Sequence, residues 1–233
     1  MITSQDNEKI KYLIKLKQSK YRKQEQKIIV EGPHLVKEAK ALGLVVEAYS
    51  IEEKEGYIQI SDSLMKKIAD TDTVVSEIAI CKMLDKKELS DKILILDKVQ
   101  DPGNLGALMR SANAFGFKTI ILNVGSVDIY NSKVIRASQG AIFKLNFRYE
   151  NLALYLDELK DYKVYGTNVI NGIALDEVKK DKKMAIILGN EGNGISNEVA
   201  SKVNKNIYIP IKDTESLNVS VAGGIIMYEL REL

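Results

Sequence analysis

The pattern of apolar and polar positions differs between the first and second parts of the chain, and it is more regular in the second part. Beyond residue 92, short runs rich in β-branched residues predict strands. These runs are 93–100, 118–125, 142–148, 163–170, 183–190 and 206–212. Stretches with helical periodicity lie at 104–115, about 131–139, 152–161, 195–203 and 217–230. Strands that alternate with helices predict an α/β fold, a mostly parallel sheet with helices on both faces.

The first part of the chain predicts a smaller α/β unit of about 80 residues. Its predicted helices are 4–27, 33–43 and 62–70, and its predicted strands are 27–32, 44–50, 56–61 and 73–80. The charged segment 84–92 lacks β-branched residues and is interpreted as a linker. The pattern therefore predicts two domains, residues 1–86 and residues 92–233.

The composition and charge of the chain exclude several classes of function. The 233 residues are 45% hydrophobic and carry a net charge of +2, so binding to a nucleic acid requires a local basic patch. The single cysteine, Cys81, excludes an internal disulfide and is interpreted as a core residue. His34, the single histidine, has no partners for a triad, and no metal site is predicted. Without a signal peptide or an apolar run of roughly 18–20 residues, a cytoplasmic protein is expected.

The stretch "DPGNLGALMRSANAFG" (101–116) places a fixed cation on an otherwise apolar helix. Its predicted core face consists of Leu105, Leu108, Ala112 and Phe115. Arg110 lies roughly opposite, and its guanidinium suits a phosphate or ribose oxygen. Asn104 follows strand 93–100 at the carboxyl end of the sheet, where α/β proteins bind ligands. The alternative is a solvent-facing arginine with no specific role.

Two later stretches add polar groups at strand ends. "LGNEGNGIS" (188–196) places Glu191 among three glycines, whose order is the reverse of the Rossmann fingerprint. A structural turn is the alternative interpretation. In "IPIKDTESLNVSVAGGIIMYE" (209–229), Ser216 is the predicted N-cap of the last helix, with Asn218 in its first turn. Core packing accounts for the apolar positions Val219, Val221, Ile225, Ile226 and Leu230.

These three stretches resemble, in order and spacing, the three motifs of the SpoU/TrmH-type RNA 2′-O-methyltransferases of the SPOUT superfamily. Residues 128–143 resemble the segment between the first two motifs, except that Ile129 and Ser132 stand where relatives often carry prolines. Residues before 84 resemble the family's ribosomal-protein-like RNA-binding domain. The resemblance implies a deep trefoil knot in the sheet domain and a homodimer that brings the first-motif arginine to the partner's cofactor.

The resemblance also implies S-adenosylmethionine as the cofactor, bound in the knot. The implied cofactor-binding residues are Thr167, Asn168, Gly189, Asn190, Glu191, Ile209, Leu217 and Asn218. The implied reaction is methyl transfer to a ribose 2′-hydroxyl, with no metal. The implied catalytic residues are Asn104, Arg110, Glu191, Ser216 and Asn218. Because a guanidinium does not normally deprotonate, Arg110 can serve as a phosphate clamp that stabilises the forming alkoxide instead of as the base.

The basic segment 9–27, with interleaved tyrosines, is predicted to contact RNA, although a solvated helix face is the alternative. The candidate RNA contacts are Lys9, Lys15, Lys20, Arg22, Lys23, Arg136 and Ser138. Ribosomal RNA is favoured over transfer RNA as the substrate. Two other functions stay open: a non-catalytic RNA-binding protein that retains the fold, and a nucleotide-dependent oxidoreductase, which the glycine order disfavours.

Overall fold

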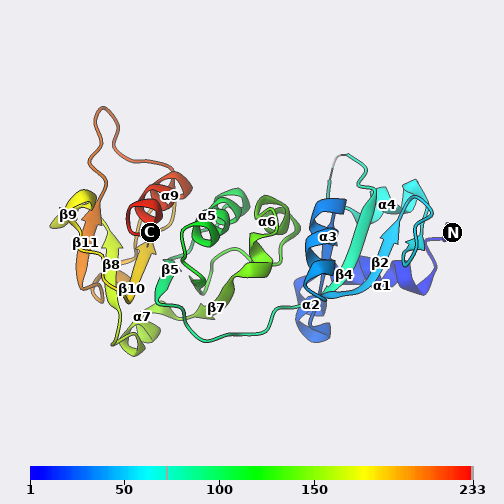
Figure 1. The fold of residues 1–233 in the computed structure, drawn as a ribbon, viewed down its shortest axis with the longest axis horizontal. Helices are drawn as coiled ribbons and strands as arrows, with labels where there is room; N and C mark the ends of the chain where they lie inside the picture. The colour runs from blue at the N-terminus through cyan, green and yellow to red at the C-terminus, as the bar shows by residue number, and fades with distance from the viewer. Residues whose placement is uncertain (72, 232–233) are drawn as a thin grey trace. The chain divides into compact units, whose positions relative to one another are not determined.

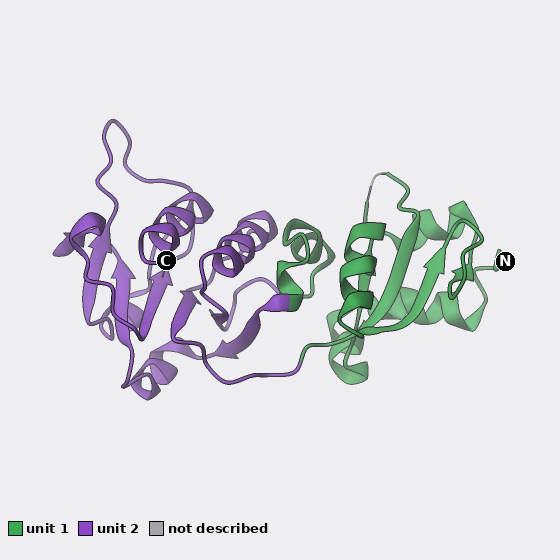
Figure 2. Ribbon diagram, in the orientation of Figure 1, with its two compact units in different colours: residues 1–84, 129–143 green, residues 85–128, 144–233 purple. Residues whose placement is uncertain are grey.

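The computed structural model describes residues 1–71 and 73–231, and the chain divides into two compact units (Figure 1, Figure 2). The first unit contains residues 1–84 and 129–143, and the second contains 85–128 and 144–233. Segment 129–143, which the sequence pattern assigns to the larger domain, thus packs with the first unit. Every helix among the described residues is too short or too polar to cross a lipid bilayer.

The first unit is built on a four-stranded sheet in the order β1-β4-β2-β3. Its strands are β1 (Lys27–Glu31), β2 (Val45–Ser50), β3 (Ile58–Gln59) and β4 (Glu77–Lys82). Its helices are α1 (Glu8–Leu16), α2 (Ser19–Glu25), α3 (Pro33–Ala41), α4 (Asp62–Ile68) and α6 (Ser132–Ala137). Strand β4 pairs antiparallel with both β1 and β2, and β3 pairs parallel with β2.

Helices cover both faces of this sheet. On one face, α1 and α4 pack against alternate residues of the central strands, among them Tyr49 and Ile80. On the other face, α3 packs against β4, β1 and β2. Because side chains alternate across a strand, Ala79 and Cys81 of β4 belong to the α3 face, and both are fully buried. Burial raises the pKa of the Cys81 thiol to about 12, so the prediction of a core cysteine is confirmed.

The predicted single helix over 4–27 is wrong, because the chain breaks into α1 and α2. The last turn of α1 leaves carbonyl groups without helical partners. The guanidinium of Arg22 on α2 donates hydrogen bonds to the carbonyls of Leu16 (3.4 Å) and Lys17 (2.5 Å). A buried side chain therefore joins the end of α1 to α2, a contact between successive helices that helical periodicity does not reveal.

The second unit contains a seven-stranded sheet in the order β7-β6-β5-β10-β8-β11-β9. Its strands are β5 (Lys92–Leu96), β6 (Thr119–Asn123), β7 (Asn146–Glu150), β8 (Lys163–Thr167), β9 (Gly172–Ala174), β10 (Met184–Leu188) and β11 (Lys205–Tyr208). All the pairings are parallel. Every residue of β5, β6 and β10 is buried, as expected of parallel strands covered on both faces.

Helices α5 (Pro102–Ala114) and α9 (Val219–Glu229) pack together beside this sheet (Figure 1). Short helices α7 (Leu152–Tyr155) and α8 (Asn197–Ala200) contribute to a core that includes Ile93 and Ile187. The predicted α/β fold with a parallel sheet and helices on both faces is therefore confirmed.

Several other elements differ from the predictions. Residues Ala141–Lys144 form a 3-10 turn instead of the start of a strand, and β7 begins only at Asn146. The sequence pattern did not predict β9, because only three residues pair there. The last helix begins after Asn218, whose side chain accepts hydrogen bonds from the backbone of Ser220 and Val221, so Ser216 is not its N-cap.

Gly223 lies where α9 approaches α5 and β10 most closely. A Cβ built there would lie 2.4 Å from Leu108 Cδ2 and 2.7 Å from Leu188 Cδ1, whereas a Cβ on Gly224 would meet only Ser111 Oγ at 3.6 Å. Both leucines are buried. We expect Gly223→Ala to unfold with a free energy about 1–3 kcal/mol lower than Gly224→Ala, because overpacking displaces core side chains. Urea unfolding of the two variants measures the difference, and equal stabilities would contradict the close packing.

Candidate functional site

The carboxyl ends of β5 and β10 lie side by side in the second unit, and the segments that follow them meet there. Asn104 Nδ2 on α5 donates a hydrogen bond to Glu191 Oε1 (3.1 Å), which follows β10. Asn218 Nδ2 at the start of α9 donates to Asn104 Oδ1 (3.1 Å). The structure thus brings together three of the predicted catalytic residues, one from each sequence motif.

Helix caps position two of these residues. Asp101 Oδ1 accepts a hydrogen bond from Asn104 N (2.7 Å) and caps α5, and Pro102 follows at the first helical position, where it loses no helical hydrogen bond. Asn218 Oδ1 accepts from Ser220 N (2.9 Å) and caps α9. Each asparagine therefore lies at the amino-terminal end of a helix, and the side chain of Asn218 is oriented by backbone N–H groups.

Glu191 accepts several hydrogen bonds from the first motif and the residue before it. Besides Asn104, the backbone N–H of Asp101 donates to Oε1 (3.3 Å) and that of Gln100 to Oε2 (3.5 Å). Burial alone would raise the pKa of Glu191, but the hydrogen bond from Asn104 and those from backbone N–H groups outweigh it and lower the pKa. The carboxylate is thus held ionised and links the loop after β10 to the start of α5.

The loop after β10 folds back onto itself. Asn190 N donates to Gly194 O and Gly194 N to Asn190 O, both at 2.9 Å. A Cβ on Gly189 would lie 2.1 Å from the carbonyl carbon of Gly194 and 2.3 Å from Ile195 N, so only glycine fits at this position. The glycines of this stretch therefore form a compact turn whose backbone faces the neighbouring cleft.

That cleft has a volume of about 520 Å³, within the range of small-molecule sites. Its walls combine apolar side chains, such as Leu188 and Ile226, with a few polar groups. All the predicted cofactor-binding residues line it: Thr167, Asn168, Gly189, Asn190, Glu191, Ile209, Leu217 and Asn218. Ser216 lines it as well. The cleft is also lined by Val169, Tyr208 and Ile211, which were not predicted to bind the cofactor. Ile211 lies in the third motif stretch, whereas Val169 and Tyr208 lie outside the three stretches.

Arg110 is not brought to this cleft. It lies exposed on α5 and is not among the residues that line the cleft. Within residues 1–71 and 73–231 it has neither a hydrogen-bond nor an ion-pair partner. Within the described residues, Asn104 and Glu191 therefore bind each other and not Arg110.

The predicted RNA contacts separate into exposed and buried side chains. Exposed members are Lys9, Lys15, Lys20 and Lys23. Arg22 is buried and binds backbone carbonyls, and Ser138 is fully buried with its hydroxyl donating to Ile135 O (2.7 Å). Arg136 forms an ion pair with the buried Glu31 (2.8 Å). Arg22 and Ser138 are thus corrected to structural residues of the first unit.

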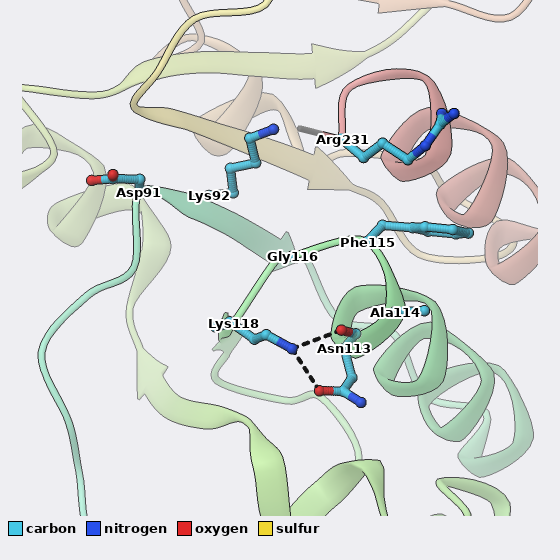
Figure 3. Close-up of a pocket in the computed structure, with 8 residues that line it drawn as sticks. All are labelled: Asp91, Lys92, Asn113, Ala114, Phe115, Gly116, Lys118 and Arg231. Carbon is cyan, nitrogen blue, oxygen red and sulfur yellow. Dashed lines mark hydrogen bonds between the residues drawn. The ribbon is translucent and has the colours of Figure 1, made fainter. Parts of the chain in front are cut away.

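A second cleft, of about 290 Å³, lies at the opposite edge of the sheet, where β5 begins (Figure 3). Lys118 Nζ donates to the carbonyl of Asn113 (2.7 Å) and to its side-chain Oδ1 (2.8 Å). Lys92 Nζ donates to Leu230 O (2.6 Å). These ammonium groups satisfy carbonyls at the ends of α5 and α9, so this cleft is interpreted as helix-end packing.

Comparison with known proteins places the chain in a family. Residues 91–228 match the SpoU rRNA Methylase family, and residues 7–79 match the MRM3-like substrate binding domain. The 23S rRNA (guanosine(2553)-2′-O)-methyltransferase RlmP of Bacillus subtilis is 38% identical over 244 residues, covering 99% of this chain and 98% of that protein. The chain belongs to the SpoU rRNA methylase family.

Solved structures agree with this assignment. An RNA 2′-O ribose methyltransferase superimposes with a TM-score of 0.83 at 27% identity, over 98% of this chain and 97% of that chain. An AdoMet-bound rRNA methyltransferase from Sinorhizobium meliloti has the same fold, with a TM-score of 0.86 at 24% identity, over 98% and 96%. The predicted family and the RNA ribose 2′-O-methyltransferase activity are confirmed.

The lowered pKa of Glu191 gives a pH dependence with a defined sign. Its contribution to stability is present above about pH 4.5 and is lost as the pH falls through the lowered pKa. We expect Glu191→Gln to lower the free energy of unfolding at pH 7 by roughly 1 kcal/mol, allowing for its exposure to solvent. This deficit should disappear towards pH 3. Urea unfolding at both pH values measures it, with Glu55→Gln in an exposed loop as a control; a deficit that persists at low pH would refute the account.

Proposed function

We propose that this chain methylates a ribose 2′-hydroxyl of ribosomal RNA with S-adenosylmethionine bound in the 520 Å³ cleft of the second unit. The observation that carries the proposal is the hydrogen-bonded series Glu191–Asn104–Asn218 at the mouth of that cleft, which joins three sequence motifs. The Bacillus subtilis relative, a 23S rRNA guanosine 2′-O-methyltransferase matched over nearly the whole of both chains, supports ribosomal RNA as the substrate class.

The cleft fits a nucleoside-like cofactor. Gly189 lets the turn close tightly against the backbone of Gly194 and Ile195, and residues of this turn line the cleft. Apolar walls suit an adenine ring, and the polar groups of Thr167, Asn168 and Asn190 suit a ribose and an amino-acid tail. When bound, S-adenosylmethionine supplies a methyl group activated by its sulfonium. Ile209 and Leu217 hold the ring, and Ser216 and Asn218 line the place where the methyl group meets the substrate.

The difficult part of the reaction is the nucleophile, because an alcohol is scarcely ionised at neutral pH. Arg110 binds the phosphate next to the target ribose and stabilises the forming alkoxide, with the proton leaving through phosphate or water. Asn104 and Glu191 order the start of α5, and thus the helix that carries Arg110. Positioning of this kind can supply several kcal/mol of rate enhancement.

A homodimer completes the site. Helix α9 exposes Val221 (50%), Ile225 (40%) and Tyr228 (52%), a stripe at helical spacing, although Val221 and Ile225 were predicted to be core residues. The stripe runs beside α5, and Tyr228 contacts Phe115 edge-on at 5.6 Å between ring centroids. Burying this stripe against a second copy brings Arg110 to the partner's cofactor cleft.

Residues 1–86 serve as the substrate-binding domain, and 92–233 as the methyltransferase domain. In the first, Lys9, Lys15, Lys20 and Lys23 lie exposed on or beside α1 and α2 and provide the local basic patch that the low net charge requires. The Lys15 ammonium lies 4.4 Å from the centre of the Tyr21 ring, and such a pair can also stack on a base.

The family's trefoil knot and a cytoplasmic location belong to the same proposal. Strand β10 inserts between β5 and β8, and the chain returns after β11 to pack α9 on α5. This order of strands is compatible with a threaded path. A ribosomal RNA substrate and a single buried thiol suit the cytoplasm.

The role of Arg110 can be tested directly. We expect Arg110→Ala to bind S-adenosylmethionine within about threefold of the native protein, because its side chain lies outside the cleft of its own chain. Methyl transfer should fall by roughly 100-fold or more. Tritium transfer to ribosomal RNA and to transfer RNA measures the activity, with the exposed Lys160→Ala as a charge-matched control. Unchanged transfer by the Arg110 variant would remove its role, and no transfer by the native protein to either RNA would favour a non-catalytic binding protein.

The dimer interface makes a separate prediction. Ile225→Glu places a charge in the exposed stripe of α9, and desolvating that charge opposes association. We expect sedimentation velocity to show a native dimer and an Ile225→Glu monomer. Leu154→Glu in α7, where the native side chain is 71% exposed, is the matched control and should stay dimeric. A native monomer, or two variants that behave alike, would contradict this interface.

A further inference from the structure

Strand β5 ends in an acidic side chain with almost no access to water. Asp97 is 1% exposed. Its Oδ1 accepts a hydrogen bond from Asn123 Nδ2 (2.6 Å), and its Oδ2 accepts one from Ser196 N (2.8 Å). A buried carboxylate is costly unless it is hydrogen-bonded, and here each oxygen has a donor. Ser196 ends the glycine turn that lines the cofactor cleft.

The same short segment of chain also holds the other end of that turn. Asp97 N donates to Leu188 O (2.9 Å), the last residue of β10. The next residue, Lys98, has φ 60°, a left-handed conformation that is uncommon for a residue with a side chain. Its carbonyl accepts a hydrogen bond from Asn190 Nδ2 (2.9 Å). Two consecutive residues therefore bind the start and the end of the turn.

We propose that Asp97 and Lys98 form a clasp that holds turn 189–196 in its cofactor-binding shape before the cofactor arrives, with Asp97 as a positioning residue for methyl transfer. The proposal rests on the proposed function, because that turn lines the cleft assigned to S-adenosylmethionine. Asp97 lies outside the cleft lining and acts through the backbone of Ser196. A turn already shaped for its ligand binds with a smaller loss of conformational entropy.

The clasp requires a carboxylate at position 97, because both of its partners are donors. Asn123 cannot reverse its amide to accommodate an amide at 97, since its own Oδ1 accepts a hydrogen bond from Leu152 N (3.3 Å). In Asp97→Asn, the new side-chain NH₂ must face either Asn123 Nδ2 or Ser196 N. Both of these groups are donors, so no hydrogen bond can form on that side. The substitution keeps the size of the side chain and removes one hydrogen bond to a charged group.

The first experiment compares Asp97→Asn with Asp157→Asn, a substitution of the same type at an exposed ion pair with Lys202. Isothermal titration with S-adenosylmethionine should give about tenfold or weaker affinity for Asp97→Asn and native affinity for Asp157→Asn. Saturating cofactor should restore most of the methyl transfer in Asp97→Asn, so KM for the cofactor rises more than kcat falls. Native affinity in Asp97→Asn would overturn the clasp.

A reciprocal exchange tests the geometry where the single variant fails to fold. In the double variant Asp97→Asn with Asn123→Asp, the amide at 97 donates to the new carboxylate and accepts from Ser196 N, and the carboxylate at 123 accepts from Leu152 N. Every hydrogen bond of positions 97 and 123 is thus restored, and the pair still carries one buried negative charge. We expect the double variant to melt like the native protein and to bind S-adenosylmethionine within about threefold of it. A folded double variant with tenfold weaker binding would contradict the proposal.

Amide hydrogen exchange separates this proposal from the proposed function. Without cofactor, the Ser196 amide should be protected in the native protein and in the double exchange, and should lose about tenfold in protection in Asp97→Asn. Fast exchange in the native protein would overturn the clasp even if the enzyme methylates RNA. If the native protein does not bind S-adenosylmethionine, the proposed function fails, and the exchange measurement still decides whether the clasp exists.

Discussion

The hydrogen bonds that join Glu191, Asn104 and Asn218 are the constraint on which the site depends. The first pair is separated by 87 residues of chain and the second by 114. Closing loops of this length costs conformational entropy that two neutral or singly charged hydrogen bonds cannot offset. The contact persists because fully buried parallel strands and the close packing of α5 on α9 already hold the three segments together. The hydrogen bonds among these three side chains thus determine how the loops are arranged, while the burial of apolar side chains supplies the stability.

Much of the second unit could be predicted from its sequence, because its central strands are apolar on both sides and end in polar turns. That pattern located β5, β6 and β10 and indicated which loops share the carboxyl edge of the sheet. The start of α9 could not be predicted in the same way. Ser216 and Asn218 are both good caps locally, and the helix begins at Asn218, whose amide also binds Asn104 on the neighbouring helix α5.

The first unit shows a second limit of sequence reasoning. Arg22 and Lys23 are neighbours with the same charge, yet Arg22 is buried and Lys23 exposed. The difference arises because the guanidinium of Arg22 donates hydrogen bonds to carbonyl groups at the end of α1. These hydrogen bonds form only when the two helices pack together. Asp97 was missed for a related reason: a single acid at the end of an apolar strand carries no motif. Its burial against two donors becomes visible only in three dimensions.

Asp97 and Arg110 are charged residues that differ in burial, and burial decides whether a charge needs partners within the folded chain. A buried charge must have its partners in the folded chain, so the hydrogen bonds of Asp97 identify its role directly. Arg110 is exposed and has no partner among the described residues, a state that costs little on its own. On the neighbouring helix, the exposed stripe that includes Ile225 leaves apolar area in water, which is unfavourable. In the proposed dimer, a second copy covers this face, which removes the apolar area from water and gives Arg110 a cofactor cleft to face. The two features are therefore better explained together than separately.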